Sequence, residues 1–359
     1  MPKILSVSTV LPPYEVKQEQ AVELTRSLFS NRYKDIERLL KVFENAEIEK
    51  RDVCMPLEWY SEPHDFKERN DLFIHHAVNL GIEAINHCLN NGDGLIKSVS
   101  PSEIDAIFFV SSTGIATPSI EARIMNRLPF RDDTKRIPIW GLGCAGGAAG
   151  ISRAYEYCKA FPKANVIVLS IELCSLTFQK EDYSKSNLVG VSLFSDGVAC
   201  ALISGNQSEI ATSGTVPSIL GTTSKLMPDS EDVMGWDIQN NGLYVIFSKS
   251  IPSIISTWLG PFVHEFLHSY HLDKDDIAHF VAHPGGKKVL EAYEAAMGFD
   301  SSKTEISRNI LRNHGNMSSP TVLYVLKEFM ENEAAAGEYG LMAALGPGFS
   351  GELLLLKWE

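Results

Sequence analysis

The sequence predicts an α/β protein whose two similar halves, built from βαβ units, pack as layers of helix and sheet. Three observations support this prediction. Of the 359 residues, 44% are apolar, which is enough for one large core or for two similar halves. The run Ile107-Phe108-Phe109-Val110 is continuously apolar, as in strands that are covered on both faces. The same order of strand, glycine-rich turn and helix occurs twice along the chain, which indicates an internal duplication.

In the first half, apolar runs, glycine turns and prolines predict the helices and strands. Residues 46–66 contain Pro56 and Pro63 and are expected to be irregular. Pro118 is expected to open a helix that ends near residue 128, because proline is favoured in a first helical turn. The remaining predicted elements are a strand at 3–10, helices at 17–30, 34–45 and 67–91, a strand at 105–112, a strand before Cys144 with a helix after it, and strands at 164–171 and 197–205.

The second half repeats this order after a boundary within residues 205–250. Its predicted elements are a strand at 277–282, a helix that ends near residue 297, a helix at 319–331 and strands at 340–345 and 351–358. We therefore divide the chain into halves at 1–205 and 206–359. In a duplicated α/β fold, loops at corresponding strand ends would meet across the pseudo-twofold axis, so that distant residues could form one site.

Charge and cysteine content exclude several classes of function. The net charge of −13 argues against binding to nucleic acid, which requires a basic face, and against an anionic membrane surface. No stretch approaches the ~18 apolar residues of a membrane span, and no secretory signal is evident. The six cysteines form no CxxC pair and no zinc spacing with histidine, so we predict free thiols in a cytoplasmic protein, with no metal site and no cofactor.

The segment Gly141-Leu142-Gly143-Cys144-Ala145-Gly146-Gly147 places a cysteine between an apolar strand and a helix of small residues. The dipole and free N–H groups at a helix start favour the thiolate, which is the reactive form of cysteine. Outward-pointing amides in such a turn could also hold an oxyanion. The alternative interpretation is a buried cysteine in a close-packed turn, because free cysteine is often a small core residue.

Two turns of the second half supply possible partners for Cys144. His283 follows the apolar residues 280–282, and Asn316 lies in Gly-Asn-Met-Ser-Ser at a helix start. A thiol needs a base or an imidazolium to become a good nucleophile, and an amide beside an imidazole can stabilise an enolate. Taken separately, His283 could be a core or capping histidine and Asn316 a turn or N-cap residue.

Several motifs resemble those of the chalcone synthase superfamily, the type III polyketide synthases of the thiolase fold. The resemblance covers essentially the whole chain and is closest to bacterial alkylpyrone synthases. It implies a thiolase-like αβαβα arrangement and a homodimer. The motifs are Thr177-Phe178, Ser192-Leu193-Phe194-Ser195-Asp196-Gly197, Ala282-His283-Pro284-Gly285-Gly286, Gly315-Asn316-Met317-Ser318-Ser319 and Ala344-Leu345-Gly346-Pro347-Gly348.

The resemblance implies a role for each matching residue. Cys144 would carry the acyl chain taken from a CoA thioester, and His283 would hold the thiolate and polarise the malonyl carbonyl. Asn316 would join His283 in stabilising the enolate that decarboxylation of malonyl-CoA leaves. Phe194 would be a gate between the CoA tunnel and the reaction cavity, with a core aromatic as the alternative interpretation. The cavity would be lined by Thr177, Cys174, Val245, Ser318, Leu345, Gly346 and Pro347, and Thr117 would reach into the partner's cavity.

Departures from the plant members of the family suggest a different starter. Val245 replaces a gate phenylalanine, Cys174 replaces a cavity threonine, and Leu345 replaces the phenylalanine before Gly-Pro-Gly. Losing an aromatic ring opens volume, and an apolar tunnel gains about 0.8 kcal/mol per buried CH₂. We therefore expect a medium- or long-chain fatty acyl-CoA starter that is extended with malonyl-CoA to an alkylpyrone.

Cations are needed for the CoA phosphates, and Lys50, Arg51 and Lys249 are the candidates, with surface solvation as the alternative for each. The nearest rival function is a ketoacyl synthase III-like enzyme, which uses Cys, His and Asn for one condensation with an acyl-carrier-protein substrate. A non-catalytic acyl-CoA-binding protein on the same fold is a further alternative. Gly-Pro-Gly at 346–348 and Asn-Met-Ser-Ser at 316–319 speak against the carrier-protein enzyme.

Overall fold

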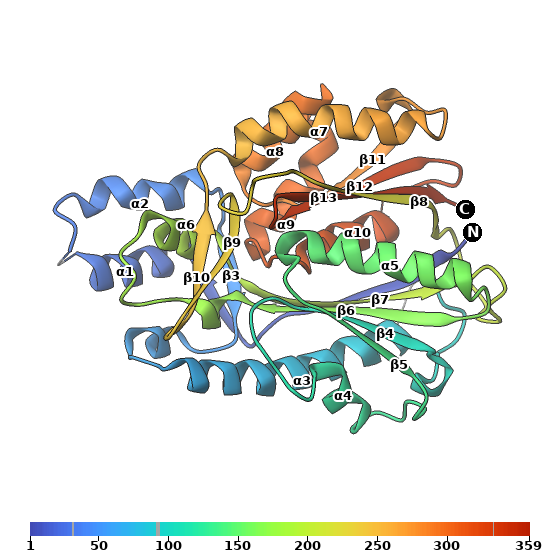
Figure 1. The fold of residues 1–359 in the computed structure, drawn as a ribbon, viewed down its shortest axis with the longest axis horizontal. Coiled ribbons are helices and arrows are strands. Elements are labelled where there is room, and N and C mark those ends of the chain that lie inside the picture. The colour runs from blue at the N-terminus through green and yellow to red at the C-terminus, as the bar shows by residue number, and fades with distance from the viewer. Residues whose placement is uncertain (31, 91–93, 333) are drawn as a thin grey trace.

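The computed structural model has five layers in the order helix, sheet, helix, sheet, helix (Figure 1). It describes residues 1–30, 32–90, 94–332 and 334–359, without the side chain of residue 332. Helices α7 (Ile251–His268) and α8 (Lys287–Met297) cover one outer face. Helices α3 (Phe66–Asn90) and α4 (Ile120–Met125) cover the other, and α5 (Gly146–Ala160) and α10 (Thr321–Asn332) fill the middle. This arrangement is the predicted αβαβα fold.

The nine strands of the main sheet fall into two sets that repeat one topology. Neighbouring strands follow the order β11-β12-β13-β8-β1-β7-β6-β4-β5. Strands β8 and β1 pair only at Lys3 and Ser218, where the two sets meet. The bounds are β1 Lys3–Val10, β4 Ala106–Val110, β5 Lys135–Ile139, β6 Asn165–Leu173, β7 Asp196–Ser204, β8 Pro217–Leu226, β11 Ile277–Ala282, β12 Tyr339–Gly346 and β13 Ser350–Trp358.

Strand directions match between the two sets, which supports the internal duplication. In the first set β1 and β7 are antiparallel, β7 and β6 are antiparallel, and β6 and β4 are parallel. In the second set β8 and β13 are antiparallel, β13 and β12 are antiparallel, and β12 and β11 are parallel. The extra strand β5 extends the first set at its edge. The two halves also correspond in their central helices, since Cys144 shortly precedes α5 and Asn316 shortly precedes α10.

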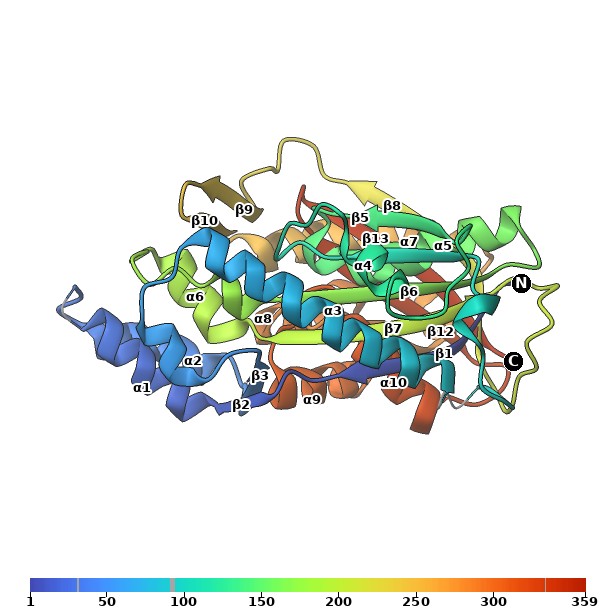
Figure 2. The same ribbon diagram turned by 90° about the horizontal axis from the view of Figure 1, so that it is seen from below.

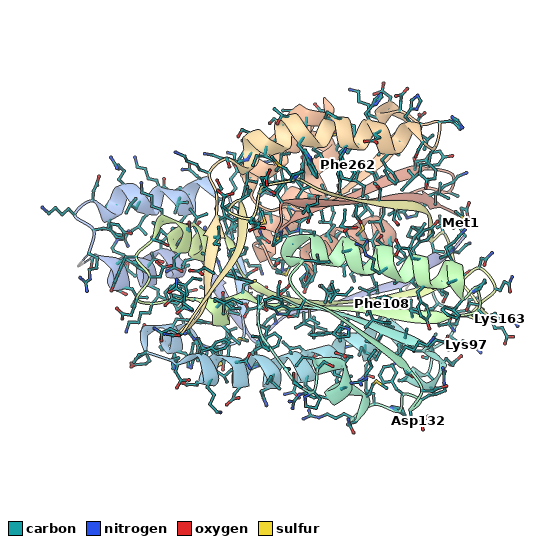
Figure 3. All side chains as sticks on the ribbon, viewed as in Figure 1. Met1, Lys97, Phe108, Asp132, Lys163 and Phe262 are labelled. Atoms are coloured by element: carbon teal, nitrogen blue, oxygen red, sulfur yellow. The ribbon has the colours of Figure 1, made fainter. Side chains whose placement is uncertain are left out.

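Packing between the layers explains the sequence pattern of the central elements. Strand β4 is buried along its whole length, as expected for a sheet covered on both faces. Phe108 of β4 packs on Tyr157 of α5 with ring centroids 6.0 Å apart, and Phe262 of α7 faces β13 (Figure 3). Small residues at the start of α5 allow close approach, because a Cβ at Gly147 would lie 2.2 Å from the Ser319 carbonyl oxygen.

Several elements were not predicted from the sequence. Residues 46–66, expected to be irregular, contain β3 (Lys50–Val53), which pairs with β2 (Tyr14–Lys17). Helix α4 begins at Ile120, two residues after Pro118, and residue 91 of the predicted long helix lies outside the described residues. Other unpredicted elements are α6 (Lys185–Leu193), β8, the hairpin of β9 (Met234–Gln239) and β10 (Gly242–Phe247), α7, and α9 (Glu305–His314).

The β9–β10 hairpin and α6 lie at one end of the molecule with α1 (Gln18–Phe29) and α2 (Ile36–Asn45), whereas the two termini lie together at the other end (Figures 1 and 2). None of the described helices combines the length and apolar character that a membrane span requires. Across the described residues, no group of three or more His, Cys, Asp and Glu side chains is placed to hold a metal ion.

Candidate active site

Cys144 lies on the turn between β5 and α5, in a short 3₁₀ segment, Gly143–Ala145. Its side chain is buried, and its Sγ lies 3.5 Å from the Ser318 hydroxyl. Gly143 has a φ of +45°, and a Cβ there would lie 2.8 Å from Pro347. Glycine is therefore required both for the backbone angle and for contact with the Gly-Pro-Gly loop. The sulfur lies just before α5, where the helix dipole favours an anion.

His283 and Asn316 are held by contacts between different elements. The His283 amide donates to the Ala343 carbonyl at 2.8 Å, which extends the β11–β12 pairing. The Asn316 Nδ2 donates to the Gly285 carbonyl at 3.1 Å, and its Oδ1 accepts from the Ser318 amide at 2.8 Å. An amide group has two N–H donors, and a hydrogen bond from the Asn316 side chain also acts to lower the pKa of the Cys144 thiol.

One buried pocket brings these three residues together. It has an empty volume of about 280 Å³ including solvent at its mouth. Its lining consists of Cys144, His283, Asn316, Gly285, Tyr293, Met234, Phe247, Ile251, Ile255, Val289 and Leu345. Both ring nitrogens of His283 lack a hydrogen-bond partner among the described residues. A thiol, an imidazole and an amide donor thus face a largely apolar space. This set can form a thioester and stabilise an enolate that must be kept from water.

Burial disfavours either charge alone in this pocket. It raises the pKa of the Cys144 thiol to about 11, and the Glu172 carboxylate adds to that shift. Burial also lowers the pKa of His283 to about 3. The neutral thiol and the neutral imidazole are therefore the favoured forms in this pocket. Opposite charges on the two groups together would offset part of the desolvation cost of each.

Residues 2–207 match the family described as chalcone and stilbene synthases, N-terminal domain, and residues 218–358 match the C-terminal domain. The chain belongs to the chalcone and stilbene synthase family. It is a type III polyketide synthase, and as such a decarboxylating, condensing acyltransferase.

Individual relatives support this assignment over almost the full chain. The "Putative chalcone synthase" of Bacillus subtilis is 50% identical, over 99% of this chain and 98% of its own length. The 1,3,6,8-tetrahydroxynaphthalene synthase of Streptomyces peucetius is 35% identical, over 99% and 93%. The solved tetrahydroxynaphthalene synthase of Streptomyces coelicolor, a bacterial type III polyketide synthase, has a TM-score of 0.90 at 28% identity and covers 99% of both chains.

A second, apolar cavity of this synthase lies beside the catalytic pocket. Its empty volume is about 760 Å³ including solvent at its mouth, and Cys174, Thr177, Phe194 and Val245 all line it. The Phe194 ring lies 6.4 Å from the ring of Phe247, which lines the catalytic pocket. Phe194 therefore stands between the two spaces, where a gate was expected. The other lining residues are Val16, Ala21, Leu24, Thr25, Leu28, Arg51, Val53, Leu57, Tyr60, Ser175, Phe178, Asn187, Gly190, Val191 and Trp236.

The remaining family-matched residues occupy three different positions. Ser318 contacts Cys144, and Leu345 lines the catalytic pocket. Gly346 and Pro347 pack on the Cys144 turn instead of lining either space. Thr117 is exposed and lines neither space within one chain.

Arg51 requires a correction, because its guanidinium is not available to a CoA phosphate. It is buried and donates to the carbonyls of Val191, Ser192 and Phe194, with Nη1 to Val191 at 2.5 Å and Nη2 to Ser192 at 2.9 Å. Arg51 therefore positions the chain that carries Phe194. Lys50 is half-buried and paired with Glu15 at 2.6 Å. Lys249 is exposed before α7.

Sequence reasoning missed Tyr293 and Glu172. Tyr293 lies four residues after Val289 on α8, and both line the catalytic pocket. Helical spacing counted from the His283 turn could have found this pair. Glu172 is buried and accepts hydrogen bonds from the Ser112 amide and from the Ser112, Thr113 and Ser319 hydroxyls at 2.8–3.0 Å. No motif pointed to Glu172, because its partners come from two segments, 112–113 and 319, that are far apart in the chain.

Proposed function

We propose that this synthase loads a medium- or long-chain fatty acyl group, extends it two or three times with malonyl-CoA, and releases an alkylpyrone. The observation that carries this proposal is the apolar cavity beside the catalytic pocket, with Val245 and Cys174 in its wall. Each methylene buried there contributes about 0.8 kcal/mol to binding. A cavity of this composition suits a hydrocarbon tail better than a polar or charged starter.

In the proposed reaction, His283 accepts the Cys144 proton, and the thiolate attacks the carbonyl carbon of the acyl-CoA thioester. The C–S bond to CoA breaks, and the CoA thiol leaves with a proton from His283. Malonyl-CoA then loses CO₂, and the electron pair of the broken C–C bond moves to the thioester oxygen as an enolate. His283 and Asn316 donate hydrogen bonds to this oxygen. The enolate carbon attacks the acyl-Cys144 carbonyl, and the thiolate leaves.

The position of Phe194 supports its proposed role as a gate. Its backbone pairs with Asn316, since the Asn316 amide donates to the Leu193 carbonyl at 2.9 Å and the Ser195 amide donates to the Asn316 carbonyl at 3.0 Å. The same segment is held by Arg51. The backbone of the gate is thus tied to the catalytic asparagine, while its ring faces Phe247 and Trp236.

Lys249 and Lys50 remain the proposed contacts for the CoA phosphates. Lys249 lies two residues after Phe247 of the catalytic pocket and next to the start of α7, where backbone N–H groups favour anions. Lys50 is paired with Glu15 on an exposed surface, and such pairs are weak enough to open for a phosphate.

We also propose a cytoplasmic homodimer. All six cysteines are buried and free, which fits a reducing compartment. Thr117 is exposed, as are the neighbouring apolar residues Ile115 and Trp140. A second chain covering this surface would bury the apolar side chains and bring Thr117 toward the partner's cavity.

The proposal is tested by incubating the purified protein with malonyl-CoA and acyl-CoA starters of increasing chain length, beside Cys144→Ala. Mass spectrometry should detect alkylpyrones from fatty starters with the wild type and none with the variant. Acetyl-CoA outcompeting lauroyl-CoA at equal concentration would refute the fatty starter. Two relatives are named tetrahydroxynaphthalene synthase and phloroglucinol synthase. The ring type of the product is therefore determined separately from the preference for a starter. Activity only with acyl-carrier-protein substrates would favour the single-condensation alternative.

A further inference from the structure

Tyr293 is a polar residue of the catalytic pocket that has no part in the chemistry described so far. It is fully buried, and its hydroxyl has no hydrogen-bond partner among the described residues. Leaving a buried hydroxyl unpaired costs on the order of 1–3 kcal/mol. Phenylalanine would fill the same space without that cost, so the hydroxyl is not explained by packing.

The positions of the other buried, unpaired polar atoms can be compared with the position of the Tyr293 hydroxyl. In the described part of the chain, the buried side-chain atoms without partners belong to Arg51, Ser111, Glu121, His283, Tyr293 and Trp358. Of these residues, His283 and Tyr293 line the catalytic pocket. Apart from Tyr293 and the proposed catalytic residues, the side chains of this pocket are apolar. The unpaired atoms in this pocket are thus the His283 nitrogens and one hydroxyl.

The Tyr293 ring is held by the strand that presents His283. It packs on Phe280 of β11 with ring centroids 5.8 Å apart and planes at 74°. Its hydroxyl stays protonated, because burial, with the charge of Cys144 adding to it, raises the pKa of Tyr293 well above its usual range. The pocket therefore contains a fixed O–H donor that keeps its proton wherever the enzyme can work.

We propose that the Tyr293 hydroxyl donates a hydrogen bond to the carbonyl oxygen of the malonyl thioester as negative charge develops there, beside His283 and Asn316. The proton stays on Tyr293 while the bond between the α-carbon and the carboxylate breaks and CO₂ leaves. A donor placed in advance in a dry pocket stabilises the enolate without reorganising at the moment of reaction. This inference rests on the condensation chemistry proposed above and is independent of the starter.

The test is malonyl-CoA decarboxylation to acetyl-CoA without any starter, measured for the wild type and Tyr293→Phe. We expect kcat to fall on the order of 100-fold, with a smaller change in KM, because one enolate donor is lost. The urea midpoint should stay the same or rise, since Phe removes an unpaired hydroxyl. A structural role for Tyr293 would instead lower both stability and activity.

The matched control is Tyr324→Phe, which removes another buried hydroxyl, one that donates to the Val10 carbonyl at 3.0 Å. It should lower the urea midpoint and leave decarboxylation unchanged. Tyr293→Met, a second variant without the hydroxyl, should also lose kcat. Decarboxylation by Tyr293→Phe within about twofold of the wild type would overturn the inference. Absence of acetyl-CoA from the wild type itself would overturn the proposed function, and this inference with it.

Discussion

Val245→Phe is the sharpest test of the acyl-tail cavity. Val245 lines that cavity with Gly190 and Phe194. A Cβ on Gly190 would lie 3.3 Å from Val245 Cγ1 and 3.5 Å from Phe194, so a larger residue at 245 has to grow into the empty space. The substitution would restore the aromatic residue of the plant enzymes and shorten the room for a tail.

The expected effect follows from the volume that the new ring occupies. Phenylalanine has four more side-chain carbons than valine, which displaces about three methylenes of the acyl tail. At ~0.8 kcal/mol per methylene, the lost burial is about 2.4 kcal/mol. This corresponds to a roughly 50-fold loss of kcat/KM for the longest starters. Short starters that do not reach the ring should be unaffected.

The assay compares kcat/KM for starters of increasing chain length in the wild type, Val245→Phe and Ile246→Phe. Ile246 follows Val245 on β10 and is absent from the cavity wall, since successive strand side chains point to opposite faces. It is therefore the matched control for adding a phenyl ring to this hairpin. The reasoning is refuted if Val245→Phe leaves chain-length preference unchanged, or if Ile246→Phe alters it equally.

Three further predictions concern Arg51, Lys249 and Glu172. Arg51→Lys should lower the free energy of unfolding by about 2 kcal/mol, because lysine cannot reach all the carbonyls through which Arg51 holds the Phe194 segment. An unchanged urea midpoint would contradict this prediction. Lys249→Ala should instead raise the KM for acyl-CoA at constant stability. Burial raises the pKa of Glu172 to about 6 from 4.5, so its contribution to stability is complete below pH 4.5 and is lost as the pH rises through 6. Urea unfolding from pH 4 to 7 should show the wild type losing about 2 kcal/mol relative to Glu172→Gln, and a difference constant with pH would contradict the shift.

Local patterns were sufficient to predict the layers and the three central residues of the site. Continuous apolar strands, glycine turns and small-residue helices act over a few residues, so they can be recognised without contacts. The sequence placed Cys144 and His283 at strand ends and Asn316 at a helix start of the duplicated elements, so that loops of the two halves could form one site. In the structure all three residues line one pocket.

Contacts between distant segments decided the rest. Arg51 looked like a cation for phosphate, but it is buried against carbonyls about 140 residues away. The hairpin of β9 and β10 and helix α7 lie in a stretch for which the sequence predicted no element, yet they supply Val245, Phe247 and Ile255 to the two spaces. Nothing in the sequence distinguished Tyr293, and only the structure shows that it lines the catalytic pocket with an unpaired hydroxyl. Motifs determine which groups can react, whereas only tertiary packing determines which polar groups are left free and how much room a substrate has, because burial and pairing depend on segments that are far apart in the chain.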